Sequence, residues 1–184
     1  MKWMVLALAL LLVPTALRSE ELKIEDLEGL AVEATVVYRG TFRRGDKQGP
    51  GEITVDWSLK FSPDQIVETT MVRRVKSPAG TARLARPFKG PIGRPGKVGD
   101  GNFVWILKDN DLTLLRVMEV GGQAATFKFT RNGQGWTCAL DTAMAKEVGA
   151  GSSRTEAAHG GKVTILGMKQ VSSTCRIKKA SKTN

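Results

Sequence analysis

The segment from Ile53 to Phe61 constrains the fold more than any other feature of the chain. Apolar and polar residues alternate strictly along this segment. The apolar residues are Ile53, Val55, Trp57, Leu59 and Phe61. Successive side chains of a β-strand point to opposite faces of a sheet. This period of two therefore predicts a strand with one buried and one solvated face.

The same reasoning predicts strands along most of the chain. They are expected at 32–42, 66–75, 102–108, 111–120, 123–131, 136–140, 162–167 and 171–177. Turn residues separate several of them. Asp109 and Asn110 are expected to form the turn between the strands at 102–108 and 111–120, and Asn132-Gly133 is the strongest hairpin signal. About eight to ten short strands joined by hairpin turns predict an all-β, antiparallel meander that curls into a barrel or half-barrel. One short helix is expected from Asp141, which can cap it, to Val148.

The N-terminal residues have the order of a secretory signal peptide. Lys2 precedes an apolar run from Trp3 to Val13, and Pro14 and small or polar residues follow. A membrane-spanning helix needs about 20 apolar residues, so cleavage after Ala16 or Ser19 is favoured over a retained anchor. We therefore expect a signal peptide at 1–19, an acidic and solvated lead-in at 20–30, one β-rich domain at 31–178 and a basic tail at 179–184. The expected location is the periplasm or the extracellular medium.

The chain contains two cysteines, Cys138 and Cys175. Oxidising compartments outside the cytoplasm join paired thiols, so an exported chain is expected to carry the Cys138–Cys175 disulfide. The alternative is two buried free thiols in a reducing compartment. Cys138 falls on the same strand face as Trp136 and Leu140, so the bridge would be directed inward.

The chain is basic, with 28 Lys and Arg against 18 Asp and Glu and a formal charge of +10. A segment rich in Pro and Gly at 76–99 predicts a long loop, with a short strand at about 81–85. Within 71–99 there are no acidic residues, and the basic residues are Arg73, Arg74, Lys76, Arg83, Arg86, Lys89, Arg94 and Lys97. They form a candidate binding surface for lipid head groups, lipopolysaccharide or acidic polysaccharide. A purely solubilising role is the alternative. Phe88 is the only aromatic residue of this loop, so nucleic acid is not an expected partner.

Three tryptophans of the predicted strands supply a second hypothesis. If the sheet closes, Trp57, Trp105 and Trp136 could line a cavity for a lipid or a hydrophobic small molecule, although filling the core also explains them. The function expected first is therefore that of an exported, non-enzymatic protein that associates with anionic components of the cell envelope. An exported carrier of a lipid or hydrophobic small molecule is the alternative. Oligomeric state is left open.

Catalytic and metal-binding patterns are weak. The single histidine, His159, lies in a flexible polar stretch without a framing motif, and no Gly-x-Ser-x-Gly elbow is present. Neither a metal nor a cofactor is expected. An envelope hydrolase remains as a third alternative, because acidic pairs such as Asp56 and Glu68 could meet in space.

One resemblance is carried by the C-terminal half. Its most specific residues are Gly135-Trp136-Thr137-Cys138 and Lys169-Gln170-Val171-Ser172-Ser173-Thr174-Cys175. Over about residues 102–178 the chain resembles small exported proteins of Gram-negative bacteria that have no assigned activity. The resemblance implies export and a disulfide, and it implies no catalytic residues. The 100–105 segment is also similar, at the level of fold alone, to outer-membrane lipoprotein carriers, which are open β-barrels.

Overall fold

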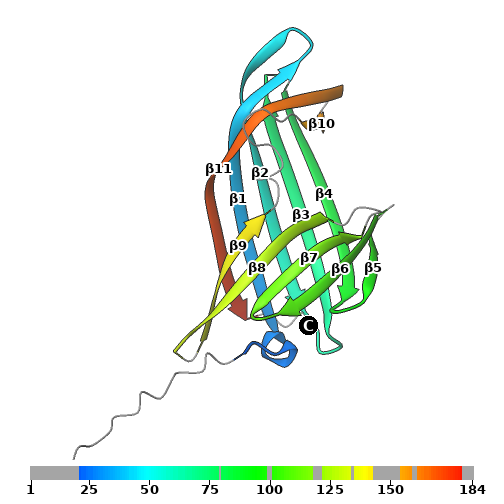
Figure 1. Ribbon diagram of the computed structural model, residues 1–184, viewed down its shortest axis with the longest axis vertical. Helices are drawn as coiled ribbons and strands as arrows, with labels where there is room; N and C mark the ends of the chain where they lie inside the picture. Colours follow the sequence, from blue (N-terminus) through cyan, green and yellow to red (C-terminus); the bar gives the residue numbers. More distant parts are fainter. Residues whose placement is uncertain are drawn as a thin grey trace, which may run out of the picture.

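The structure is a computed structural model of the 184-residue chain, and it describes residues 21–78, 80–98, 101–117, 122–133, 135–142, 154–158 and 161–179. These residues are almost entirely β-strand and form two antiparallel sheets without a closed barrel (Figure 1). The all-β class is confirmed. The elements are η1 (Ile24–Leu27), β1 (Leu30–Arg44), β2 (Lys47–Phe61), β3 (Ile66–Ser77), β4 (Gly80–Pro91), β5 (Pro95–Val98), β6 (Gly101–Lys108), β7 (Asp111–Val117), β8 (Gly122–Asn132), β9 (Gly135–Thr142), β10 (Arg154–Ala158) and β11 (Gly161–Lys179).

The first sheet has the strand order β10-β11-β1-β2-β3-β4. Its long central strands keep one register over many residues, so the apolar series of β1 and β2 lie side by side on one face. Val32 is opposite Leu59, and Val36 is opposite Val55. We call this apolar side the inner face, because it faces the second sheet, and the polar side the outer face. The predicted alternation of Ile53–Phe61 is confirmed, since all five of its apolar side chains are buried.

The second sheet has the order β5-β6-β7-β8-β9 and lies across the lower part of the first sheet in Figure 1. The two sheets share one core, in which Phe127 of β8 is central. The ring of Phe127 lies 6.0 Å from Trp57 of the first sheet and 6.1 Å from Trp105 of the second. Edge-on and tilted ring contacts of this kind add to the stabilisation that burial of the rings provides.

A predicted hairpin turn joins β6 to β7. Asp109 and Asn110 both have positive φ, at 49° and 67°, which is the backbone that the favoured two-residue hairpin turn requires. The side chain of Asn110 also accepts a hydrogen bond from the backbone N–H of Leu22. The turn therefore holds the segment before η1 against the second sheet.

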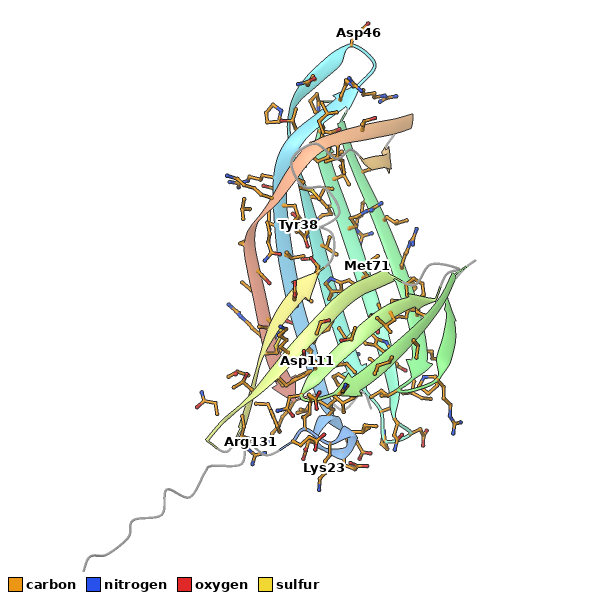
Figure 2. All side chains as sticks on the ribbon, in the orientation of Figure 1. Lys23, Tyr38, Asp46, Met71, Asp111 and Arg131 are labelled. Atoms are coloured by element: carbon orange, nitrogen blue, oxygen red, sulfur yellow. A yellow bond between two sulfur atoms is a disulfide. The ribbon has the colours of Figure 1, made fainter. Side chains whose placement is uncertain are left out.

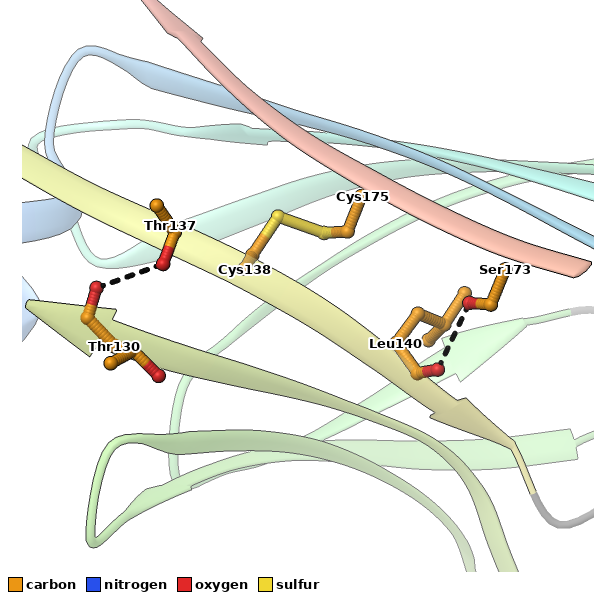
Figure 3. The surroundings of a disulfide bond; sticks show 6 residues. All are labelled: Thr130, Thr137, Cys138, Leu140, Ser173 and Cys175. Carbon is orange, nitrogen blue, oxygen red and sulfur yellow. Dashed lines mark hydrogen bonds between the residues drawn. A yellow bond between two sulfur atoms is a disulfide. The ribbon is translucent and has the colours of Figure 1, made fainter. Parts of the chain in front are cut away.

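The disulfide joins the two sheets along one side. Cys138 of β9 and Cys175 of β11 are bonded, with their Cα atoms 5.4 Å apart (Figure 3). Beside the bridge, the hydroxyl of Ser173 donates a hydrogen bond of 3.2 Å to the carbonyl oxygen of Leu140. The predicted pairing is confirmed, and free thiols are excluded among the described residues.

On the opposite side the two sheets meet through aromatic packing. Phe88 of β4 stacks on Phe103, with ring centroids 5.7 Å apart, and on Trp105 at 6.4 Å. Below this contact, the N–H of Gly93 donates a 2.6 Å hydrogen bond to the carbonyl oxygen of Trp105. These contacts hold the lower end of β4 against β6.

The expectation of a loop at 76–99 is wrong. β4 runs without interruption from Gly80 to Pro91 and pairs with β3 over its whole length. It is an edge strand, and in an edge strand every second N–H points away from the ladder. A proline such as Pro87 therefore removes no necessary hydrogen bond. The short strand expected at 81–85 lies within β4.

The expected solvated lead-in is also corrected. Leu22 and Leu27 are buried in the core, and the residues between them include the 3-10 helix η1. The acidic side chains Glu25 and Asp26 remain exposed. The segment therefore covers the lower end of the core.

Two further expectations changed at the C-terminal end. The two strands expected at 162–167 and 171–177 are one strand, β11, with register shifts against β1. The helix was expected to begin at Asp141, but Asp141 and Thr142 are the last two residues of β9. Residues 143–150 lie outside the described residues. The signal peptide at 1–19 also lies outside them. Nowhere in the described residues is there a helix long and apolar enough to cross a membrane.

Candidate binding surface on the inner face

The inner face of β2, β3 and β4 carries a row of three side chains with different properties. Trp57 is opposite Met71 in the β2–β3 pair, and Met71 is opposite Arg86 in the β3–β4 pair. Directly opposite residues of an antiparallel pair present their side chains on the same face. The row therefore runs from a buried indole through a half-buried thioether to an exposed guanidinium.

The burial of the inner face falls toward β4. On β1 and β2 it is almost completely buried, including Val36 and Val55. The cross-strand row that contains Val36 and Val55 continues through Arg73 of β3 to Leu84 of β4, and Leu84 is 37% exposed. Figure 2 shows Met71 at mid-height of the molecule, near the upper edge of the second sheet. Above the contact with Phe103 and Trp105, solvent thus reaches the inner face of β4. We call this surface the strip, and it consists of the apolar Ala82 and Leu84 and the basic Arg86.

Three polar groups in this part of the core have no hydrogen-bond partner. They are the indole N–H groups of Trp57 and Trp105 and the hydroxyl of Thr69, whose residues are 5%, 2% and 2% exposed. Thr69 lies opposite Phe88 on the inner face, and both indoles pack on Phe127. A buried polar group left without a partner costs about 1–3 kcal/mol, so each such group needs an explanation.

The basic residues predicted as one surface lie on different faces. Arg73 and Arg86 belong to the inner face, whereas Arg74, Lys76, Arg83 and Lys89 belong to the outer face. Arg94 is exposed in the turn between β4 and β5, and the side chain of Lys97 in β5 lies outside the described set. The strand period thus divides the predicted cluster, because residues one apart in sequence point to opposite sides.

The outer-face residues take part in cross-strand ion pairs. Arg74 contacts Asp56 at 2.5 Å, and the carboxylate of Asp56 also accepts a 2.9 Å hydrogen bond from the hydroxyl of Thr35. Farther along the same face, Arg39 pairs with Glu52 at 3.0 Å. These side chains are substantially exposed, so each pair is expected to contribute less than about 1 kcal/mol.

The three predicted cavity tryptophans are only partly brought together. Trp57 and Trp105 share Phe127, as described above. Trp136 is half-buried on β9, and the guanidinium of Arg131 lies 5.3 Å from the centre of its ring. Trp136 therefore belongs to the lower tip of the β8–β9 hairpin.

The acidic pair of the hydrolase hypothesis is not assembled. Asp56 is opposite Val72 of β3, and Glu68 lies four residues farther along that strand. At roughly 3.3 Å per residue, the two are separated by about 13 Å along the sheet. Within the described ranges no group of His, Cys, Asp or Glu could hold a metal ion. His159 lies outside those ranges.

A hollow lies at the lower end of the molecule, between the segment around η1 and the β6–β7 turn. Its volume is about 430 Å³, and Leu22, Ile92 and Ile106 are among its lining residues. Charged residues of both signs surround it, including Lys23, Glu25 and Asp109. The buried unpaired polar groups lie elsewhere, among the aromatic side chains between the sheets.

Sequence reasoning missed Met71, Thr69 and Leu84 as candidate site residues. For β4, the signal was the period of two that Ala82, Leu84 and Phe88 follow. Pro87, Pro91 and the neighbouring glycines concealed that period. Comparison of the chain with protein-family models, curated proteins and solved structures finds no match. The resemblance to small exported proteins therefore rests on its motif residues alone.

Proposed function

We propose that the protein is an exported, non-enzymatic binding protein that holds the apolar part of a lipid or other hydrophobic small molecule. The binding surface is the inner face of β3 and β4. One observation carries the proposal: Leu84 is 37% exposed on the same face that is buried at Val55 and Val36. Arg73 lies between Val55 and Leu84 in this row. The exposed Leu84 side chain still gives an apolar ligand a place to bury surface, at about 25 cal/mol per Å².

The arrangement of the two sheets supports this proposal. They are joined at β9 and β11 by the disulfide, and at β4 and β6 by Phe88, Phe103 and Trp105. The strip at Leu84 is therefore supported by β3 on one side, and the aromatic contact holds the lower end of its strand against the second sheet. Sites for small molecules are usually preformed in this way and lined mainly by apolar and aromatic side chains.

Export is part of the proposal. It is supported by the disulfide, since such bonds persist in oxidising compartments. The signal-peptide pattern of the first 19 residues adds independent support. A ligand taken from the cell envelope fits a location in the periplasm or outside the cell.

The test is binding of a hydrophobic probe to matched variants. The disulfide-bonded protein is titrated with the fluorescent probe N-phenyl-1-naphthylamine, and probe emission is followed. Leu84→Glu places a charge in the strip and is expected to weaken binding at least fivefold, because burying a charge against an apolar ligand is costly. Ile106→Glu is the matched control, since Ile106 is also 37% exposed but belongs to the lower hollow.

The outcomes separate the two apolar surfaces. Weaker binding in Leu84→Glu with unchanged binding in Ile106→Glu supports the proposal. The reverse result would move the site to the lower hollow, and no saturable binding by the wild-type protein would reject a carrier function. Native mass spectrometry of protein purified from its own host then gives the mass of any ligand that remains bound.

A second candidate function is association of the outer face with anionic components of the cell envelope. The observation that favours it is the distribution of charge. The exposed basic side chains of the outer face include Lys60, Lys76, Arg83, Lys89, Lys169 and Arg176. The carboxylates of Glu33, Glu52 and Asp56 are in ion pairs with other basic residues, and Glu68 lies between Lys60 and Lys89 on the same face. A net positive field therefore remains.

Vesicle co-sedimentation tests this second function. Binding to anionic vesicles, including vesicles with lipopolysaccharide, is expected to fall as salt shortens the screening length, and neutral vesicles should not bind. Neutralising the outer-face residues Lys76, Arg83 and Lys89 together is expected to weaken binding more than threefold. A smaller loss, or binding that does not respond to salt, would contradict the role of this surface.

A further inference from the structure

We infer that the ligand of the inner face is an acyl amphiphile with a negatively charged head group, and that Arg86 binds that head group. This inference rests on the proposed function and names its ligand class. It combines the charge at the edge of the strip with the unpaired donors behind it.

Arg86 is placed where a head group would emerge from the strip. It lies on the inner face of the edge strand β4, opposite Met71, and its side chain is exposed. Among the described residues no acidic side chain pairs with it. The outer-face arginines Arg39 and Arg74, by contrast, have carboxylate partners.

The inner face around Arg86 also lacks negative charge. The inner-face residues of β1 to β4 include no Asp or Glu, while Arg73 lies diagonally across from Arg86. Diagonal neighbours of an antiparallel pair are about 7–8 Å apart, within reach of long side chains. Arg73 has other interactions, but its charge still adds to the positive potential at the strip.

The indole of Trp57 supplies a hydrogen-bond donor in the same cross-strand row. Its N–H has no acceptor, although its residue is 5% exposed. At about 4.8 Å between strands, the Cα atoms of Trp57 and Arg86 are about 10 Å apart. A ligand with carbonyl or ester oxygens between its chain and its head group would place acceptors near this donor. Thr69, in the neighbouring row opposite Phe88, and Trp105, which stacks on Phe88 from the second sheet, are further unpaired donors.

Met71 and Leu84 make an acyl ligand a better match than a free inorganic anion. They lie on the same face as Arg86, one directly opposite it and one two residues away on the same strand. A free phosphate would gain nothing from them, whereas an acyl chain would bury them. The ligand is therefore expected to need both parts.

The experiment compares two lysophospholipids with the same 14-carbon chain. Lysophosphatidylglycerol has a net negative charge and lysophosphatidylcholine is zwitterionic, and both are used below the concentration at which they form micelles. Binding to the disulfide-bonded protein is measured by calorimetry. The anionic lipid is expected to bind about tenfold more tightly, which is the scale of one charged hydrogen bond.

Matched variants assign the difference to one side chain. Arg86→Gln is expected to reduce the affinity for the anionic lipid about tenfold and the affinity for the zwitterionic lipid by less, since the choline cation offsets the phosphate charge of the latter. Arg86→Lys should retain most of the preference. Lys128→Gln is the control, because Lys128 is an exposed basic residue of β8 in the second sheet and belongs to neither proposed surface.

Each remaining outcome overturns a defined part of the argument. Equal binding of both lipids, with no effect of Arg86→Gln, would reject the charged head group and leave the carrier function intact. Binding of neither lipid would reject the carrier function itself. Competition by millimolar inorganic phosphate alone would show a simple anion site and reject the acyl requirement.

Discussion

The hydroxyl groups of Tyr38 and Thr142 are hydrogen-bonded to each other, although 104 residues separate them in the sequence. Tyr38 lies in the middle of β1 and is completely buried, and Thr142 is the last residue of β9 (Figure 2). The contact therefore joins the first sheet to the end of the second. Both hydroxyls are buried, and each is the hydrogen-bond partner of the other. Without this partner, either hydroxyl would destabilise the core.

Tyr38 predicts a loss of stability at alkaline pH. Burial raises the pKa of the Tyr38 phenol above its usual value near 10, and the negative charge of Asp141 raises it further. The unfolded state then ionises first as pH rises, so the contribution of Tyr38 to the free energy of unfolding should be constant below about pH 9 and fall above pH 10. Denaturant unfolding at a series of pH values measures this.

The same residue provides its own spectroscopic control. Tyr38 is the only tyrosine of the chain, so tyrosinate absorbance reports this phenol alone. Absorbance should appear only when the protein unfolds. In Tyr38→Phe the alkaline fall should become smaller, and at neutral pH the variant should lose about 1–3 kcal/mol because Thr142 loses its partner. Titration of the folded protein near pH 10 would contradict the assigned burial.

Gly40 and Gly167 offer a matched test of close strand packing. A Cβ atom on Gly40 would overlap the backbone carbonyl of Gly167, whereas a Cβ on Gly167 would meet nothing within 4 Å. Gly40→Ala is therefore expected to lower the free energy of unfolding by about 1–3 kcal/mol. Gly167→Ala should change the free energy of unfolding by less than about 1 kcal/mol. Its sign should be stabilising where the lower conformational entropy of the unfolded alanine chain is the larger effect. Similar losses in both variants would contradict the strand register at this position.

The disulfide is expected to contribute substantially to stability. It closes a loop between residues 37 apart, for which the loop-entropy relation gives about 4 kcal/mol. Cys138→Ser combined with Cys175→Ser should lower the free energy of unfolding by at most about 4 kcal/mol. This loss should appear as a lower urea midpoint. Reduction of the wild-type protein with dithiothreitol should give the same midpoint. An unchanged midpoint would show that β9 and β11 are held together by other contacts.

Trp57→Phe tests whether the unpaired indole serves ligand binding. The change removes some packing on Phe127, but it also removes a buried N–H without an acceptor. These effects oppose each other, so the free energy of unfolding should change by less than about 1.5 kcal/mol. Affinity for the acyl lipid should fall about three- to tenfold. Unchanged affinity would assign this indole to the core alone.

The sequence by itself determined the class of fold and many of its elements. The alternation in Ile53–Phe61, the turn residues Asp109 and Asn110, and the Asn132-Gly133 hairpin are local signals, and the structure confirms each of them. The disulfide was predictable because only one pairing of two cysteines exists within the chain. Such features depend on residues close in sequence or on simple counting.

Only the tertiary structure decided on which face each residue of the basic segment lies. The prolines of 76–99 are typical of a loop, but β4 is an edge strand, where their missing N–H groups are not needed. Pairing with β3 then places Arg86 on the inner face and Arg83 on the outer face. That β4 forms an edge, and that Trp57 and Trp105 meet at Phe127, depend on contacts between residues far apart in the chain. Local periodicity cannot specify such contacts, because it fixes which residues share a face but not which face meets which.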